Sequence, residues 1–165
     1  MAVYNDYVDT QILAGRLTGS LAGQGSKTIR TFVSFDTVAA HDAGSIYRVI
    51  KSIPSSVIPI TLWIATDGVT AMNDVNVGLF QVGAGGAEVG TEVLASAIDL
   101  SSAVARTAPK DGLGNITNAN WGKQLWELAG ETIDDKFSHY DIALTSVADL
   151  SEADTIVVWG EFAVS

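Results

Sequence analysis

Four acidic residues lie close together in the second half of the chain and are the first candidates for chemistry. They are Glu127, Glu131, Asp134 and Asp135. Glu127 and Glu131 are four residues apart and would share one face of a continuous helix, but Gly130 lies between them. Glycoside hydrolysis requires two carboxyl groups that face each other across a cleft. Spacing alone does not show such a pair, so we assign no catalytic residue and expect no enzyme.

The glycine-rich segments suggest nucleotide binding, and both fail the test. A dinucleotide fingerprint beginning at Gly83 needs a third glycine where Glu88 stands. A phosphate-binding loop ending at Lys27 needs a glycine where Ser26 stands. Both segments are predicted to be flexible loops, and no cofactor is expected.

Metal binding has equally little support. Asn73, Asp74 and Asn76 offer oxygen atoms, but their spacing does not match the calcium loop of an EF-hand. His41 and His139 lack the short spacing of a zinc site. The chain has no cysteine, which excludes disulfides, thiolate ligands and cysteine catalysis. We expect solvated turns at these positions and no metal.

The four tryptophans have two main interpretations. Trp121 and Trp126 fall in a predicted helix, and Trp63 and Trp159 fall on the weaker faces of predicted strands. Core packing is the first interpretation for each. A subunit interface is the alternative, because tryptophan is enriched at interfaces. Their spacing gives no support to a carbohydrate-binding platform.

Composition limits the classes of partner. The formal net charge is −10 with only nine Lys and Arg, which argues against binding to nucleic-acid phosphates. Hydrophobic residues make up 47% and charged residues 17%, which argues against disorder. The N-terminus does not look like a signal peptide, and no apolar run approaches the ~18 residues of a membrane span. We expect a soluble protein made in a cytoplasm, with no membrane contact.

The element pattern is one of short strands. The longest apolar run, residues 46–66, contains Pro54 and Pro59, and it predicts two strands joined by a turn. In its second half Ile58, Ile60, Leu62 and Ile64 alternate onto one face, as a half-buried strand requires. The predicted strands cover residues 28–38, 46–53, 58–66, 75–82, 88–100, 140–145 and 156–164.

One short helix is predicted near residues 121–129. Trp121, Leu125 and Leu128 are spaced so that they share one helical face. Asn118 or Asn120 is expected to cap its start, and Gly130 to follow its end.

The predicted fold is an all-β antiparallel β-sandwich, with a jelly roll as the leading form. Residues 28–165 form a single domain, and residues 1–27 form an extended N-terminal arm rich in glycine. The arm either lies over its own domain or reaches a neighbouring subunit or a larger surface. For the second case the candidate interface residues are the large side chains Tyr4, Tyr7, Val8, Ile12 and Leu13.

Several short sequence segments and their order along the chain resemble those of a known family. A Met-Ala-x-Tyr start and a glycine-rich lead-in precede the strand–turn–strand about Ile53-Pro54. LWELAG at Leu125–Gly130, YDIALT at Tyr140–Thr145 and a closing DTIVVWGEFAV strand follow. From about residue 28 onward this layout resembles small virion structural proteins of tailed bacteriophages, the kind that decorate or cement the capsid.

The resemblance implies a non-enzymatic jelly-roll protein on the exterior of a phage head, made in the host cytoplasm. It implies a homotrimer that binds major capsid subunits, and it brings no catalytic residues. Two other classes stay open: a head-fibre or tail adhesion module that binds carbohydrate, and a small jelly-roll hydrolase.

Overall fold

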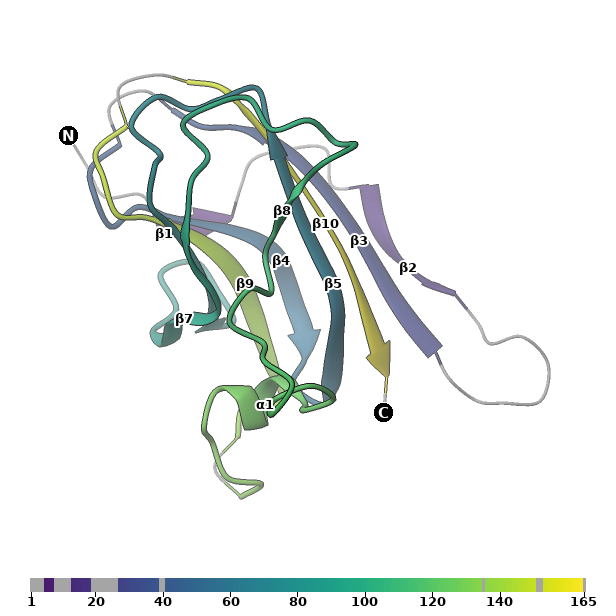
Figure 1. Ribbon diagram of the computed structural model, residues 1–165. Helices are drawn as coiled ribbons and strands as arrows, with labels where there is room; N and C mark the ends of the chain where they lie inside the picture. Colours follow the sequence, from purple (N-terminus) through teal and green to yellow (C-terminus); the bar gives the residue numbers. More distant parts are fainter. Residues whose placement is uncertain are drawn as a thin grey trace.

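The computed structural model describes residues 5–7, 13–18, 27–38, 41–134, 136–150 and 153–164, and within them the chain is nearly all β (Figure 1). Two sheets pack face to face as a sandwich, which confirms the predicted fold class. The strands are β1 (Asn5–Tyr7), β2 (Leu13–Thr18), β3 (Lys27–Asp36), β4 (Ile46–Pro54), β5 (Val57–Thr66), β6 (Val75–Gln81), β7 (Glu88–Ile98), β8 (Lys110–Asp111), β9 (His139–Ser146) and β10 (Thr155–Val164).

The strand order has the jelly-roll pattern. One sheet runs β1-β4-β9-β6-β7 and the other β2-β3-β10-β5-β8. Counting from β3, the first strand pairs with the last, β4 with β9, β5 with β8 and β6 with β7, all antiparallel. Such nested pairs form when a long antiparallel ribbon wraps around a core, as in the double Greek key of a jelly roll. The parallel pairing of β1 with β4 adds to this pattern.

Strand β10 shows how the period of two builds the sandwich. Ile156, Val158 and Phe162 are buried between the sheets, whereas Trp159 and Glu161 point to the outer face and remain partly exposed. Gly160 lies between these outward residues, and a Cβ there would come within 2.9 Å of the Phe162 ring. The glycine at position 160 therefore makes room for a core aromatic ring.

Strand β5 departs from the predicted alternation. Val57, Pro59, Leu62 and Ile64 are buried, while Ile58 and Ile60 are only partly buried. The register with β10 shifts at this point, because Glu161 pairs with Thr61 and the next residue pairs with Pro59. This bulge leaves an extra residue in β5 and reverses the faces on its N-terminal side. The prediction that Ile58 and Ile60 share a face with Leu62 and Ile64 was wrong.

The helix is shorter than the prediction. Helix α1 covers Leu125–Leu128, and Gln124 and Glu127 form a reciprocal capping box at its start. Gly130 follows the helix with φ +76°, as expected for a glycine after a helix end.

Trp121 precedes the helix and is 65% exposed, so its predicted place on the apolar helical face was wrong. Gln124, and not Asn118 or Asn120, caps the helix.

Parts of residues 1–27 pair with the two sheets. Strand β1 adds an outer strand beside β4, and β2 adds one beside β3, with Leu13 in register with Phe32. Tyr7 ends β1 and Leu13 begins β2. The other three candidate interface residues, Tyr4, Val8 and Ile12, lie outside the described residues. The division into an arm and a single domain stays a prediction.

A buried ion pair supports the sheet formed by β4, β9 and β6. Arg48 of β4 donates to an Asp141 carboxylate oxygen at 3.0 Å, and both side chains are fully buried. Arg48 also donates to the carbonyl oxygens of Gln81 and Gly86, and its guanidinium lies 5.1 Å from the Phe80 ring centre. The β6–β7 loop is thereby fixed against the outer side of this sheet.

Candidate functional site

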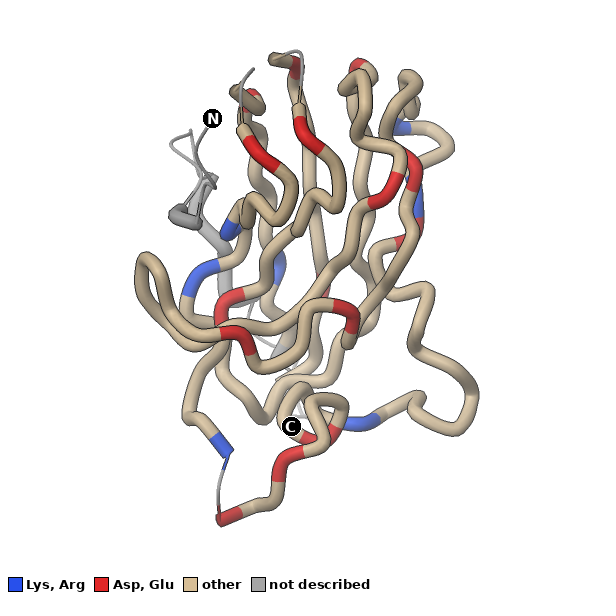
Figure 2. The backbone as a smooth tube through the Cα atoms, turned by 90° about the vertical axis from the view of Figure 1, so that its left-hand side faces the viewer, with Lys and Arg blue, Asp and Glu red and all other residues tan. Residues whose placement is uncertain are grey.

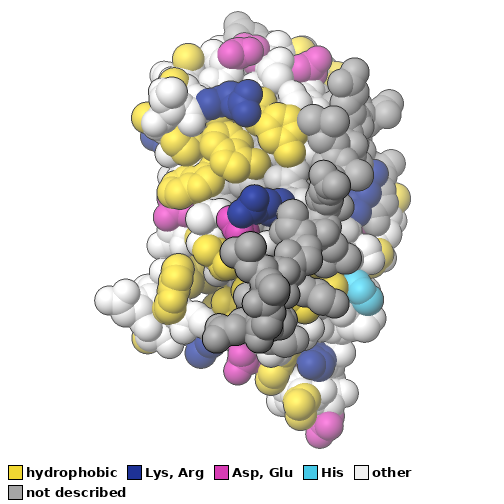
Figure 3. All heavy atoms as spheres, turned by 90° about the vertical axis from the view of Figure 1, so that its right-hand side faces the viewer, with side chains coloured by type: hydrophobic (Ala, Val, Ile, Leu, Met, Phe, Trp, Pro, Cys, Tyr) yellow, Lys and Arg dark blue, Asp and Glu magenta, His cyan; other side chains and the backbone are white. Residues whose placement is uncertain are grey.

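The outer face of the β2-β3-β10-β5-β8 sheet carries a row of aromatic side chains. Phe32, Trp159 and Trp63 are direct register partners on three adjacent strands. All three are partly exposed, although an outward sheet face usually carries polar residues. We call Phe32, Trp159 and Trp63 the aromatic row. Figure 3 views the molecule from this side and shows hydrophobic side chains gathered beside basic ones.

Charged groups border the aromatic row. The guanidinium of Arg106 lies 5.5 Å from the Phe32 ring centre and 5.9 Å from that of Trp159. Both distances are within the range of cation–π attraction. Two residues away along β3 and β10, Arg30 donates to Glu161 at 3.1 Å, and their side chains are 63% and 30% exposed. An ion pair this exposed adds little stability, so its groups are available to a partner.

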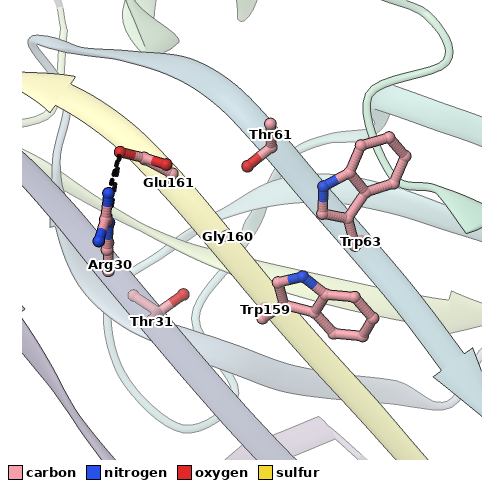
Figure 4. A pocket seen from close by; sticks show the side chains of 7 residues that line it. All are labelled: Arg30, Thr31, Thr61, Trp63, Trp159, Gly160 and Glu161. Carbon is pink, nitrogen blue, oxygen red and sulfur yellow. Dashed lines mark hydrogen bonds and ion pairs between the residues drawn. The ribbon is translucent and has the colours of Figure 1, made fainter. Parts of the chain in front are cut away.

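A shallow cleft of about 390 Å³ lies along these residues (Figure 4). Trp63 and Trp159 form one end of it, and the Arg30–Glu161 pair lies at the other, with Thr31 and Thr61 between them. A second hollow of about 370 Å³ includes Arg106 in its lining. Aromatic and arginine side chains beside concave surfaces are the groups that dominate binding energy at interfaces.

The charge next to the aromatic row differs from that of the whole chain. The charged groups that border the row, Arg30, Arg106 and Glu161, have a formal charge of +1, against −10 for all 165 residues. Figure 2 shows the molecule from another side, where acidic residues are spread over the strand ends and loops.

A second exposed apolar surface lies on residues 123–138, which we call the projection. It contains α1 and extends beyond one end of the sandwich (Figure 1). Ile133 is 67% exposed and Phe137 is 38% exposed. The sequence of the projection has four acidic and two basic residues, a formal charge of −2.

Two of the four acidic residues considered for catalysis, Glu127 and Glu131, have structural partners. Glu127 belongs to the capping box, and its carboxylate accepts from the Gln124 amide at 2.8 Å. The Glu131 carboxylate accepts a hydrogen bond from the Tyr140 hydroxyl. Burial and this hydrogen bond raise the pKa of Tyr140 above its usual range. Asp134 is exposed, and Asp135 is outside the described residues.

The other candidates also have local roles. Asn76 donates to Glu92 at 3.0 Å and accepts from the Ala97 amide at 3.2 Å, which ties β6 to β7. His41 Nδ1 lies 2.7 Å from the Tyr47 hydroxyl, and partial burial lowers the His41 pKa. Within the described ranges, no group of three or more His, Asp or Glu residues could hold a metal ion. The same ranges contain no helix with the length and apolar character needed to cross a membrane.

Sequence reasoning identified two members of the aromatic row and missed the rest. Trp63 and Trp159 were assigned to the weaker faces of their strands, with an interface as an alternative. Phe32 lies in the predicted strand 28–38 with no role assigned to it, and Arg106 lies between predicted elements. The signal available in advance was an aromatic residue at an outward position in each of three strands. The missing fact was that these strands are neighbours.

Comparison with known proteins shows a shared fold. No protein-family model matches the chain, and no curated protein matches it. A chain from the capsid of Ralstonia phage GP4 is 15% identical with a TM-score of 0.55, and the match covers 100% of this chain and 98% of that one. A chain from the capsid asymmetric unit of cyanophage Pam1 is 12% identical with a TM-score of 0.53, covering 95% and 99%.

Proposed function

We propose that this protein is a structural component of a tailed-phage virion that decorates or cements the head by binding major capsid subunits. The observation that carries the proposal is the fold likeness to chains from two phage capsids over almost the full length of every chain compared. The likeness is to complete chains, so it covers the whole sandwich. A fold alone does not fix a function, but the aromatic row and the projection are surfaces suited to assembly.

The proposed location is the exterior of the head, after synthesis in the host cytoplasm. The proposed partners are the major capsid protein and further copies of the chain, assembled as a homotrimer. The side chains of the N-terminal arm, Tyr4, Tyr7, Val8, Ile12 and Leu13, are proposed to contact the capsid or a neighbouring copy. The mechanism is structural, with no catalytic step.

Addition of the purified protein to phage heads that lack it tests the proposal. We expect saturable, stoichiometric binding and a higher temperature of head disruption, because a bound bridge stabilises the assembled state by mass action. The measurements are co-sedimentation and a thermal scan of the heads. Absence of binding at micromolar concentration would reject the cement role.

Removal of residues 1–25 tests the proposed role of the arm. We expect the truncated protein to fold, because β1 and β2 are outer strands of their sheets, but to lose head binding or self-association. Circular dichroism checks the fold and co-sedimentation checks binding. Normal head binding and normal assembly of the truncated protein would show that the arm has no such role.

A carbohydrate-binding adhesion module is the second candidate. The cleft with Trp63 and Trp159 at one end favours it, because sugar rings stack on aromatic faces and hydroxyl and charged groups lie beside them. The Thr31 hydroxyl oxygen is buried there without a hydrogen-bond partner among the described residues. Glycan-array binding that is lost in Trp63→Ala would favour adhesion, and the absence of any glycan signal would count against it.

A further inference from the structure

The aromatic row and the projection both present apolar side chains to solvent. The row presents three partly exposed aromatic rings with the Arg106 guanidinium beside two of them. The projection presents Ile133 and Phe137, which are 67% and 38% exposed. Exposed apolar groups gathered at two separate places indicate contact surfaces, because a monomer normally scatters such residues singly.

The projection is held in a fixed shape. Its Glu131 carboxylate accepts from the Tyr140 hydroxyl, and Tyr140 belongs to the buried strand β9. The Phe137 ring meets the Tyr140 ring edge-on at 6.1 Å between centroids, and the Lys136 ammonium lies 4.9 Å from the Trp126 ring centre. A surface that is already ordered loses little conformational entropy when it binds.

Charge selects the partner. Two copies with a net charge of −10 repel each other in most orientations. The projection, whose sequence has a formal charge of −2, and the groups that border the row, with +1, are an exception. Asp134, beside Ile133, is exposed, and so is Arg106 beside the row. Apolar contact and opposite charge therefore favour the same pairing, of the projection with the row of a second copy.

The two surfaces lie at different places on the molecule. The projection extends from one end of the sandwich, and the row lies on the flank formed by β3, β10 and β5 (Figure 1). Contact between unlike surfaces is heterologous, so each copy keeps one of each surface for a further neighbour. Such contacts close into a ring when the rotation between copies permits.

We propose that copies of this chain associate head to tail, with the projection of one copy seated on the aromatic row of the next. The inference rests on the self-association in the proposed function and names the surfaces that carry it. It is independent of whether the assembled ring binds a capsid. Ile133 and Phe137 lie against Trp63 and Trp159, and Asp134 approaches Arg106.

Two variants that each lose one surface test the pairing. The row variant is Trp63→Ala with Arg106→Glu, and the projection variant is Ile133→Asp with Phe137→Ala. We expect the wild type to be oligomeric and each variant alone to be monomeric, with self-association weakened by about 30-fold or more. The row variant keeps an intact projection, and the projection variant keeps an intact row. In an equimolar mixture these two intact surfaces can form one contact. The mixture should form a heterodimer, measured by light scattering and sedimentation.

Controls separate assembly from folding. Arg106→Glu alone changes an exposed side chain and serves if the Trp63 variant unfolds. Val147→Asp places a charge on a 47% exposed apolar residue beyond the C-terminal end of β9, whereas the projection precedes its N-terminal end. It should assemble as the wild type does. Circular dichroism and thermal melts verify that every variant is folded.

Each other outcome overturns the inference. A monomeric wild type up to high micromolar concentration excludes the contact. Oligomers of the projection variant alone would show that the row pairs with itself, and two folded variants with unchanged assembly would place the interface elsewhere. Head binding is scored separately, so an assembled protein that ignores phage heads rejects the proposed function and leaves the head-to-tail contact standing.

Discussion

At the scale of residues, two Arg–acid pairs within the described ranges have very different surroundings. Arg48 and Asp141 are fully buried, and Asp141 also accepts from the Ser52 amide at 2.8 Å and the Gly83 amide at 3.2 Å. The Arg30 and Glu161 side chains are 63% and 30% exposed. The Arg48–Asp141 pair therefore has a structural role, whereas the Arg30–Glu161 pair is accessible. Water screens the Arg30–Glu161 pair and not the buried one.

We expect Asp141→Asn to lower the free energy of unfolding by about 3–5 kcal/mol, because the Arg48 charge would stay buried without its counter-ion. The comparison variant Glu161→Gln should cost only about 0–1 kcal/mol. Urea unfolding followed by tryptophan fluorescence measures both. Equal losses in the two variants would mean that burial does not separate the pairs.

The raised pKa of Tyr140 predicts that the free energy of unfolding depends on pH. The raised pKa of its hydroxyl means that the folded tyrosine stays protonated where an unfolded one ionises, near pH 10. Its contribution is complete below pH ~10 and is lost as the pH rises toward the folded pKa. Tyr140→Phe should cost about 1 kcal/mol at pH 7, and the gap to the wild type should narrow at high pH. Urea titrations from pH 7 to 11 measure the gap, and a constant gap would contradict this account.

At the scale of elements, close approach of strands explains why one glycine is required. A Cβ on Gly78 in β6 would lie 2.2 Å from the Gly90 carbonyl oxygen and 2.5 Å from two backbone carbon atoms of Thr91. The backbones of β6 and β7 are therefore almost in contact at this point. The register between the two strands shifts repeatedly. Only a residue without a side chain permits this close approach.

We expect Gly78→Ala to destabilise the fold by about 1–3 kcal/mol or more, because the obstructing atoms are backbone and cannot rotate away. Gly114→Ala is the matched control, since the nearest atom to its added Cβ is 3.9 Å away. It should change stability by less than about 0.5 kcal/mol. Thermal unfolding of the two variants checks the difference, and comparable melting temperatures would refute it.

At the scale of the whole molecule, the nested pairing gives the first strands and the last strand different positions in their sheets. Strand β10 lies between β3 and β5 and pairs with both along most of its length. Among the described residues, strands β1 and β2 each pair on one side only. The sheet is complete only when the last strand is in place, although its neighbours lie far earlier in the sequence.

Truncation after residue 154 should therefore abolish folding, because it removes the central strand and the buried side chains of Ile156, Val158 and Phe162. Removal of residues 1–25 should leave a cooperative unfolding transition. Circular dichroism and limited proteolysis distinguish the two truncations. A folded protein lacking β10 would show that the sheet does not depend on its centre.

The sequence by itself determined the class of fold. The strand patterns over residues 140–145 and 156–164, a proline at the end of β4 and Gly130 after α1 are local signals, and each predicted the element observed. Local signals suffice there because backbone geometry and burial of one strand face act over a few residues. The helix prediction began too early, because the capping box of Gln124 competes with the pattern that includes Trp121.

Only the tertiary structure decided which distant residues meet. The bulge opposite Glu161 turned Ile58 and Ile60 toward the other face. Pairing of β3 with β10 and of β10 with β5 placed Phe32, Trp159 and Trp63 in one row, and pairing of β4 with β9 placed Arg48 beside Asp141. These neighbours depend on strand order and register, which are fixed by how the whole core packs and not by any local pattern.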